Sequence, residues 1–184
     1  MTDEVKVDVR RSGRRFDAEA TLDLAADAQT VWDTITDYGA LPRFMPGIRA
    51  CRVVEREALA DGDERLVVEQ QGEFRFLLFA QAMTVRLNIE HQYLRVSEAK
   101  AVSFDLGLLK RRAIDVFEGR YELGPVTGRR NAPRMQLRYR AVIGLGLPPP
   151  PAVGYLAVQQ NLSAQLQAVA AEVGRRHARR KLAS

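Results

Sequence analysis

The side chains that most often perform catalysis are few in this sequence, and they stand apart from one another. The two histidines are His91 and His177, and neither has cysteines or carboxylates at the spacing of a metal site. Cys51 is the single cysteine, so it forms neither an internal disulfide nor a cysteine-based zinc site. The sequence therefore predicts no metal, no bound cofactor and no catalytic constellation.

Motifs for nucleotide binding and for serine catalysis are also missing. The glycines of GLGLPPPP, residues 144–151, lead into prolines, which offer a phosphate no backbone N–H donors. A nucleophilic serine would need a sharp turn between a strand and a helix. No turn of this kind is expected at Ser12, Ser97, Ser103 or Ser163.

Large apolar side chains with a few polar tips indicate binding of a hydrophobic molecule instead. Methionines adapt to irregular shapes, and tyrosine hydroxyls orient a polar head group. An amide such as Gln81, in an apolar row, needs either a ligand carbonyl or a neighbouring backbone group as partner. For each methionine and phenylalanine, ordinary core packing is the alternative. The residues expected to line a cavity are Leu41, Phe44, Met45, Phe79, Gln81, Met83, Phe117, Tyr121, Met135, Tyr139, Tyr155, Val158 and Gln159.

The mouth of that cavity is expected in the stretch TVWDTITDYGALPRFMPGI, residues 30–48. Asp27 is a suitable N-cap for a short amphipathic helix, in which Trp32 is expected to pack under a sheet. The segment Pro42–Pro46 then forces a turn or a single further helical turn, although it carries large apolar residues. These side chains either form an apolar entrance or plug the end of the core.

Residues 16–24 and 48–143 have the alternating pattern of β-strands. The Asp-Gly pair of LADGD, residues 59–63, predicts a hairpin turn, and residues 124–134 predict a longer loop. The apolar parity changes between Phe76 and Phe79, and again between Val116 and Phe117. One-residue slips of this kind indicate β-bulges, which bend a sheet. A strongly curved antiparallel sheet of six or seven strands follows.

Residues 152–178 carry apolar side chains at steps of three and four, which predicts a long amphipathic helix. Its partner is expected to be the concave face of the curved sheet. The fold class is therefore α+β, with one layer of sheet wrapped around a long C-terminal helix.

Three motifs in this order resemble the helix-grip fold of the START-like superfamily. They are AADAQTVWDTITDYGALPRFMPGI, FEGRYEL and GLGLPPPPAVGYLAVQQNLSAQLQAV. More narrowly, the chain is similar to the polyketide cyclase/dehydrase-like group, which includes coenzyme Q-binding START-domain proteins. The resemblance implies three parts: an N-terminal extension at 1–15, a helix-grip domain at 16–175 and a basic tail at 176–184.

The resemblance also implies a cavity between the sheet and the long helix. The first functional hypothesis is non-catalytic binding or transport of a lipid, an isoprenoid quinone or a polyketide-like aromatic. The second is a cyclase or dehydratase that uses Tyr121, Tyr139, Gln81 or His91, and it weakens if His91 lies on the outer surface. The third is an interaction protein that contacts ribosomal RNA or a membrane through Arg175–Lys181.

The charge distribution bears on that third hypothesis. The formal net charge is +5, and five basic residues among the last ten account for it. A tail of this kind either is solvated and frayed or contacts anionic lipid or RNA. The sequence has no apolar run long enough for a membrane span and no secretory signal at its start, so we expect a cytoplasmic protein. It leaves the oligomeric state open.

Overall fold

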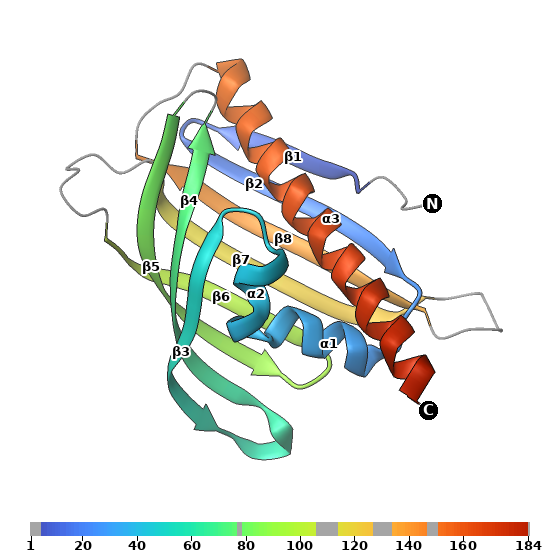
Figure 1. Ribbon diagram of the computed structural model, residues 1–184. Helices are drawn as coiled ribbons and strands as arrows, with labels where there is room; N and C mark the ends of the chain where they lie inside the picture. The colour runs from blue at the N-terminus through green and yellow to red at the C-terminus, as the bar shows by residue number, and fades with distance from the viewer. Residues whose placement is uncertain (1–4, 77–78, 106–113, 127–133, 147–150, 184) are drawn as a thin grey trace.

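The sheet is an antiparallel layer of eight strands, in the order β1-β2-β8-β7-β6-β5-β4-β3. The computed structural model describes residues 5–76, 79–105, 114–126, 134–146 and 151–183. The strands are β1 (Val7–Ser12), β2 (Arg15–Leu24), β3 (Ile48–Ala58), β4 (Glu64–Phe76), β5 (Phe79–Gln92), β6 (Val96–Asp105), β7 (Ile114–Pro125) and β8 (Met135–Leu145). Figure 1 shows that the sheet curves, with β3, β4 and β5 bending around the helices.

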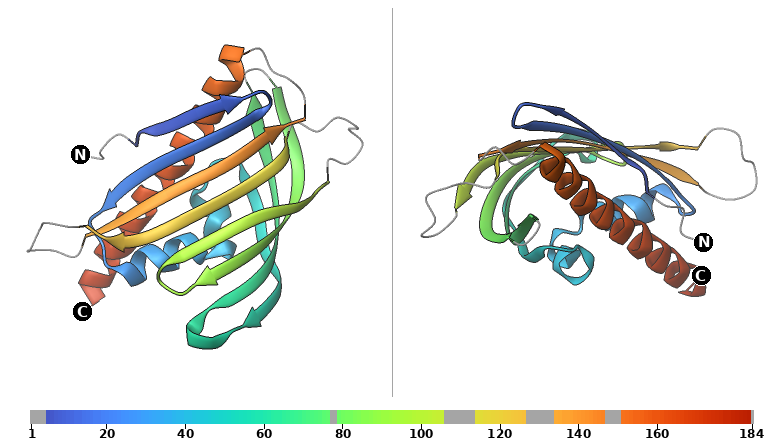
Figure 2. Two further views of the ribbon diagram at one scale, coloured as in Figure 1. Left: turned by 180° about the vertical axis from the view of Figure 1, so that it is seen from behind. Right: turned by 90° about the horizontal axis from the view of Figure 1, so that it is seen from above.

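Three helices cover the concave face of the sheet. They are α1 (Ala28–Thr36), the single turn α2 (Leu41–Phe44) and the long α3 (Pro151–Ala183), with short 3-10 turns at η1 (Tyr38–Ala40) and η2 (Ala60–Gly62). Seen from above in Figure 2, α3 runs along the inside of the curved layer. The expected α+β helix-grip architecture is therefore confirmed.

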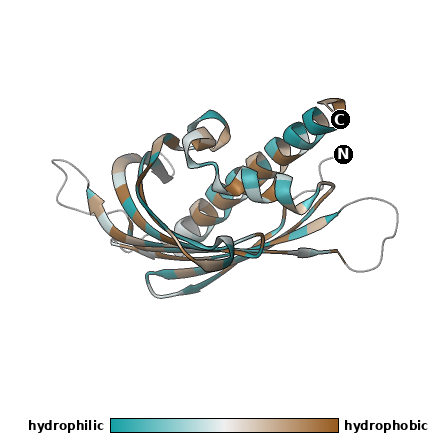
Figure 3. Ribbon diagram, turned by 90° about the horizontal axis from the view of Figure 1, so that it is seen from below, coloured by the Kyte–Doolittle hydropathy of each residue, from teal (hydrophilic) through white to brown (hydrophobic). Residues whose placement is uncertain are grey.

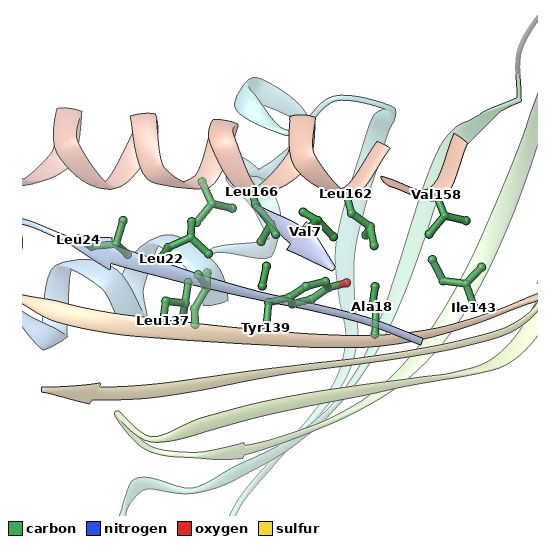
Figure 4. Close-up of a cluster of buried hydrophobic side chains, with 14 of the residues drawn as sticks. Val7, Ala18, Leu22, Leu24, Leu137, Tyr139, Ile143, Val158, Leu162 and Leu166 are labelled. Carbon is green, nitrogen blue, oxygen red and sulfur yellow. The ribbon is translucent and has the colours of Figure 1, made fainter. Parts of the chain in front are cut away.

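The core forms where α3 packs against β1, β2 and β8. Val158, Leu162 and Leu166 point from the helix toward the sheet, and Leu137 and Ile143 of β8 point back at them (Figure 4). Alternation between inward apolar and outward polar residues, visible along the strands in Figure 3, sets which side of each strand faces α3.

Two expectations about the strands are wrong. Residues 7–12, expected in an extension outside the domain, form β1 and pair with β2 from Val7↔Ala20 to Ser12↔Arg15, so the sheet has eight strands. The parity change after Phe76 marks a hairpin and not a bulge, because Phe76 of β4 pairs with Phe79 of β5. The second expected slip is present as a register shift between Ile114 and Val116.

The C-terminal helix is also longer than the expected 152–178. It begins at Pro151 and continues through Ala183, so the basic residues that were expected in a tail form its last turns. In the part of the chain that the structure describes, no helix is both long and apolar enough to span a membrane.

Candidate ligand-binding cavity

A cavity of about 200 Å³ lies between α3 and the concave face of the sheet. Its wall is built by residues of α1, η1, α2, α3 and six strands, β3 to β8. A groove of about 620 Å³ adjoins it and shares four wall residues: Gly47, Ile48, Glu73 and Asn161. The cavity and the groove therefore meet beside the loop that follows α2.

The helix that leads to this loop is fixed at its start by Asp27. One carboxylate oxygen accepts the backbone N–H of Thr30 at 2.8 Å, and the other accepts the Thr30 hydroxyl at 2.7 Å. Burial alone would raise the pKa of Asp27, but these hydrogen bonds and one from His177 lower it to about 2. The expected N-cap is confirmed.

The loop after α2 is held against β4 by two glycines. Gly47 has φ +81°, and its carbonyl oxygen accepts the backbone N–H of Glu73 at 2.8 Å. A Cβ atom on Gly72 would lie 2.4 Å from that same oxygen, so only glycine permits this approach. The contact places Met45, Gly47 and Ile48 in the cavity wall.

The structure places seven of the expected ligand-binding residues in the cavity wall. They are Leu41, Met45, Met83, Phe117, Tyr121, Tyr139 and Val158. The side chains of Phe79 and Gln81 lie outside the described residues, although the backbone of both belongs to β5. That the expected residues bind a ligand stays a prediction.

The remaining four expected residues lie away from this wall. Met135 and Tyr155 pack against the hydrophobic core, and Phe44 packs beside the guanidinium of Arg176, 6.0 Å from the ring centre. The side-chain amide of Gln159 donates to the carbonyl oxygen of Val7 at 3.3 Å. Gln159 therefore holds α3 to β1, a strand that the sequence analysis did not predict.

Several wall residues stand outside the expected ligand-binding set. Val85 and Leu87 follow Met83 at every second position of β5, and this parity places all three on one face in the sequence as well. Tyr38, which follows Val31 and Ile35 at helical steps of four and three, and Ser97 of β6 also line the cavity. The position of Ser97 at the cavity depends on how β6 pairs with β5, which no local pattern encodes.

Two tyrosines carry hydroxyl groups into the buried interior. The rings of Tyr121 and Tyr139 lie 4.7 Å apart at an angle of 41°. Burial raises the pKa of both hydroxyls, so they remain protonated at neutral pH. Neither makes a hydrogen bond with the described residues, and Gly119, whose hypothetical Cβ would lie 3.6 Å from the Tyr139 oxygen, leaves that oxygen room. Both hydroxyls are therefore available to a polar group of a ligand.

His91 does not lie on the outer surface. It is 5% exposed, and the edge of the Trp32 ring packs against it with ring centres 5.3 Å apart. Its Nε2 lies 2.8 Å from the hydroxyl oxygen of Tyr38, and its Nδ1 lies 3.5 Å from a carboxylate oxygen of Glu64. The best candidate base of the sequence therefore touches the cavity through Tyr38.

The basic end of α3 docks on the acidic side of α1. Arg176 donates to Asp37 at 3.0 Å, and Arg180 donates to Asp33 at 3.0 Å. His177 lies 3.2 Å from the carboxylate of Asp27. These pairs neutralise part of the charge that could attract RNA or anionic lipid. They also tie the last turns of α3 to the helix that leads to the cavity mouth.

No metal centre is indicated in the described part of the chain, since no three histidine, cysteine or acidic side chains gather closely enough to hold an ion.

Comparison with known proteins gives one family match. The family model described as polyketide cyclase / dehydrase and lipid transport matches residues 24–164. None of the curated protein sequences compared with the chain matches it.

Solved structures share the architecture at low sequence identity. A START superfamily protein from Mycobacterium smegmatis aligns with a TM-score of 0.68 at 16% identity, over 86% of this chain and 97% of that one. The Zhui aromatase/cyclase from Streptomyces sp. R1128 aligns with a TM-score of 0.65 at 18% identity, over 88% and 95%. A STAR-related lipid transfer protein from Xanthomonas axonopodis aligns with a TM-score of 0.67 at 18% identity, over 93% and 94%. At these identities the likeness is one of fold.

Proposed function

The chain belongs to the polyketide cyclase / dehydrase and lipid transport family, and we propose that it binds or carries a hydrophobic small molecule in the cavity under α3. The observation that carries this proposal is the cavity itself, which is lined mainly by apolar side chains and meets a groove beside the loop after α2. Protein interiors are normally packed without voids of this size, because an empty cavity loses dispersion contacts.

The volume limits what the cavity can hold. Small-molecule sites usually measure about 300–1,000 Å³, and a cavity of about 150 Å³ is enough for benzene. The cavity of about 200 Å³ therefore fits one ring or a short branched chain, and the adjoining groove of about 620 Å³ can hold the rest of a longer molecule. An aromatic or quinone head group with an apolar tail, or a compact polyketide-like aromatic, fits this division.

The groove has the surface needed for such a tail. Leu156, Ala157 and Ala164 of α3 form one side, and Leu156 is 47% exposed although it is a large apolar residue. Arg49 and Glu73, which form an ion pair, lie on the opposite side. A ligand tail would cover the leucine, while the ion pair would lie at the edge where polar atoms of the ligand emerge.

Contact with RNA or a membrane through the end of α3 is less well supported. Arg176, His177 and Arg180 are engaged with acidic groups of α1, so an incoming anion would have to compete with Asp27, Asp33 and Asp37.

The test combines recovery of a natural ligand with a blocked cavity. Val85 lines the cavity from β5, whereas Val102 of β6 is 54% exposed, so the same substitution to tryptophan fills the cavity in one variant and adds surface bulk in the other. We expect native mass spectrometry to find an apolar molecule on the wild type and on Val102→Trp. Naphthalene affinity should fall about tenfold or more in Val85→Trp.

Two outcomes would refute the proposal. One is wild-type protein that neither retains a ligand from cells nor binds naphthalene. The other is a folded Val85→Trp variant that binds naphthalene as well as the wild type does.

A further inference from the structure

Three polar side chains connect the protein surface with the buried cavity. Glu64 of β4 and His91 of β5 line a small surface pocket of about 130 Å³, and the Glu64 side chain is 27% exposed. Tyr38 of η1 lines the ligand cavity on the other side of His91. The distances that link the three side chains are 3.5 Å from Glu64 Oε2 to His91 Nδ1 and 2.8 Å from His91 Nε2 to the Tyr38 oxygen.

The His91 ring is held in one orientation. Glu64 and His91 are direct partners in the pairing of β4 with β5, which fixes the carboxylate beside Nδ1. The Trp32 ring meets the imidazole edge-on, and the Tyr38 ring lies nearly parallel to it at an angle of 13°. The imidazole therefore presents Nδ1 toward the surface and Nε2 toward the cavity.

The charges around His91 determine where its proton lies. The Glu64 carboxylate favours a proton on Nδ1, so Nε2 is the acceptor for the Tyr38 hydroxyl. Burial lowers the pKa of His91; Glu64 opposes this, and Arg56 of β3 adds to it. Around Tyr38, burial raises the hydroxyl pKa; a hydrogen bond with Ser97 opposes this, and Cys51 of β3, Tyr121 of β7 and Glu64 add to it. The resting pair at neutral pH is neutral imidazole and protonated tyrosine.

The Tyr38 oxygen is thereby prepared to receive a proton. Its own hydrogen is donated to His91, and its oxygen lies near the Ser97 hydroxyl, which also lines the cavity. A ligand hydroxyl bound there could donate to the Tyr38 oxygen, while the Tyr38 hydrogen is already directed at the basic Nε2 of His91.

We propose that Glu64, His91 and Tyr38 form a proton relay, which deprotonates a weakly acidic hydroxyl of phenol type bound in the cavity. The ligand O–H bond breaks and its proton passes to the Tyr38 oxygen, while the Tyr38 proton passes to Nε2 of His91. The products are a ligand oxyanion and an imidazolium, which the Glu64 carboxylate stabilises. The reverse transfers restore the resting state, so no other reactant is needed.

This inference requires a ligand in the cavity and so rests on the proposed function, but it adds acid–base chemistry to simple binding. Tyr38 is the group that would contact the ligand, and His91 and Glu64 are positioning residues that act through it.

The test uses two probes that share a ring. 4-Nitrophenol absorbs visible light only when ionised, and nitrobenzene lacks the hydroxyl. The wild type, Tyr38→Phe and His91→Gln are each saturated with 4-nitrophenol, and absorbance is followed as a function of pH. We expect the bound probe in the wild type to be half ionised about one pH unit lower than in either variant, a tenfold change in its ionisation constant. Nitrobenzene affinity, measured for the same proteins, reports any change in cavity shape.

The outcomes separate the relay from binding itself. Equal ionisation of bound 4-nitrophenol in the wild type and in His91→Gln would overturn the relay and leave the binding function intact. Failure of both probes to bind the wild type would overturn the two together.

A second measurement needs no variant of the relay. The chain has only two histidines, so nitrogen NMR resolves His91 with His177 as an internal reference. We expect His91 to carry its proton on Nδ1 and to shift toward imidazolium when 4-nitrophenol binds. An unchanged His91 signal in the saturated protein would overturn the proposal.

Discussion

Replacing Glu172 with glutamine should destabilise the protein at neutral pH but not in strong acid. The Glu172 side chain is 9% exposed and lies on α3 beside two arginines. Arg175 Nε donates to one carboxylate oxygen at 2.6 Å, and Arg176 Nε donates to the other at 2.7 Å. Hydrogen bonds from Arg175 lower the pKa of Glu172 from 4.5 to about 2, against the opposing effect of burial and with further help from Arg176.

The size of the effect follows from the difference between the two pKa values. Each pKa unit corresponds to about 1.4 kcal/mol, so the ionised Glu172 stabilises the fold by at most about 3.5 kcal/mol. Because Arg175 is 47% exposed, water screens part of this, and we expect a loss of about 2 kcal/mol at pH 7. A carboxylate whose pKa is lower in the folded than in the unfolded state stabilises the fold at pH values above its unfolded pKa. The difference in stability between the wild type and Glu172→Gln should therefore shrink as the pH falls from 4.5 toward 2.

Urea unfolding followed by circular dichroism measures this difference directly. The wild type and Glu172→Gln are compared at neutral pH and at steps through the acid range. Glu118→Gln, which removes an exposed carboxylate of β7, is the matched control and should have little effect. A loss of equal size at every pH would show that the substitution acts through packing, and no loss at neutral pH would refute the assigned role of the ion pairs.

Two further predictions concern the cavity wall. Tyr139→Phe removes a hydroxyl that has no partner among the described residues, so thermal unfolding should show unchanged or slightly raised stability. Tyr38→Phe leaves His91 Nε2 unpaired and should lower the free energy of unfolding by about 1–3 kcal/mol. Equal effects of Tyr139→Phe and Tyr38→Phe on stability would contradict this reasoning. Gly72→Ala would place a Cβ 2.4 Å from the Gly47 carbonyl oxygen and should cost about 1–3 kcal/mol in urea unfolding. Gly39→Ala meets nothing within 4 Å and serves as its control, so similar losses in both would argue against the close approach.

The architecture was predictable because its strongest patterns are long. The helical period of α3 and the alternation along β2 and β8 are each repeated many times, which identifies both elements and their buried faces. The hairpin between β4 and β5 was misread for a physical reason. The backbone of Phe76 pairs with that of Phe79 across it, and a hairpin with two intervening residues changes the parity of the sequence just as a bulge does. Residues 77 and 78 are both leucine, so the sequence has no turn residue there.

That error explains why the most polar part of the site was missed. Reading residues 73–90 as one continuous strand hides the hairpin that sets the register of β4 against β5, and with it the position of Glu64 opposite His91. Gln159 illustrates the same limit on α3, because its partner belongs to β1, which was not expected to form. By contrast, Met83 and Val158 needed only the local period to be placed on an inward face. Local pattern therefore finds the apolar wall, whereas the polar contacts depend on register between distant segments.

The segment from α1 to α2 joins the ionic and the apolar parts of the molecule. Asp37 binds Arg176 of α3 at 3.0 Å, and the next residue, Tyr38, contacts His91 at 2.8 Å. Leu41 and Met45 follow in the cavity wall. The same few residues thus anchor the end of α3, position the tyrosine of the proposed relay and form the entrance. A short loop that combines prolines with large apolar side chains suits this place, because it keeps the entrance fixed to the helix that covers the ligand.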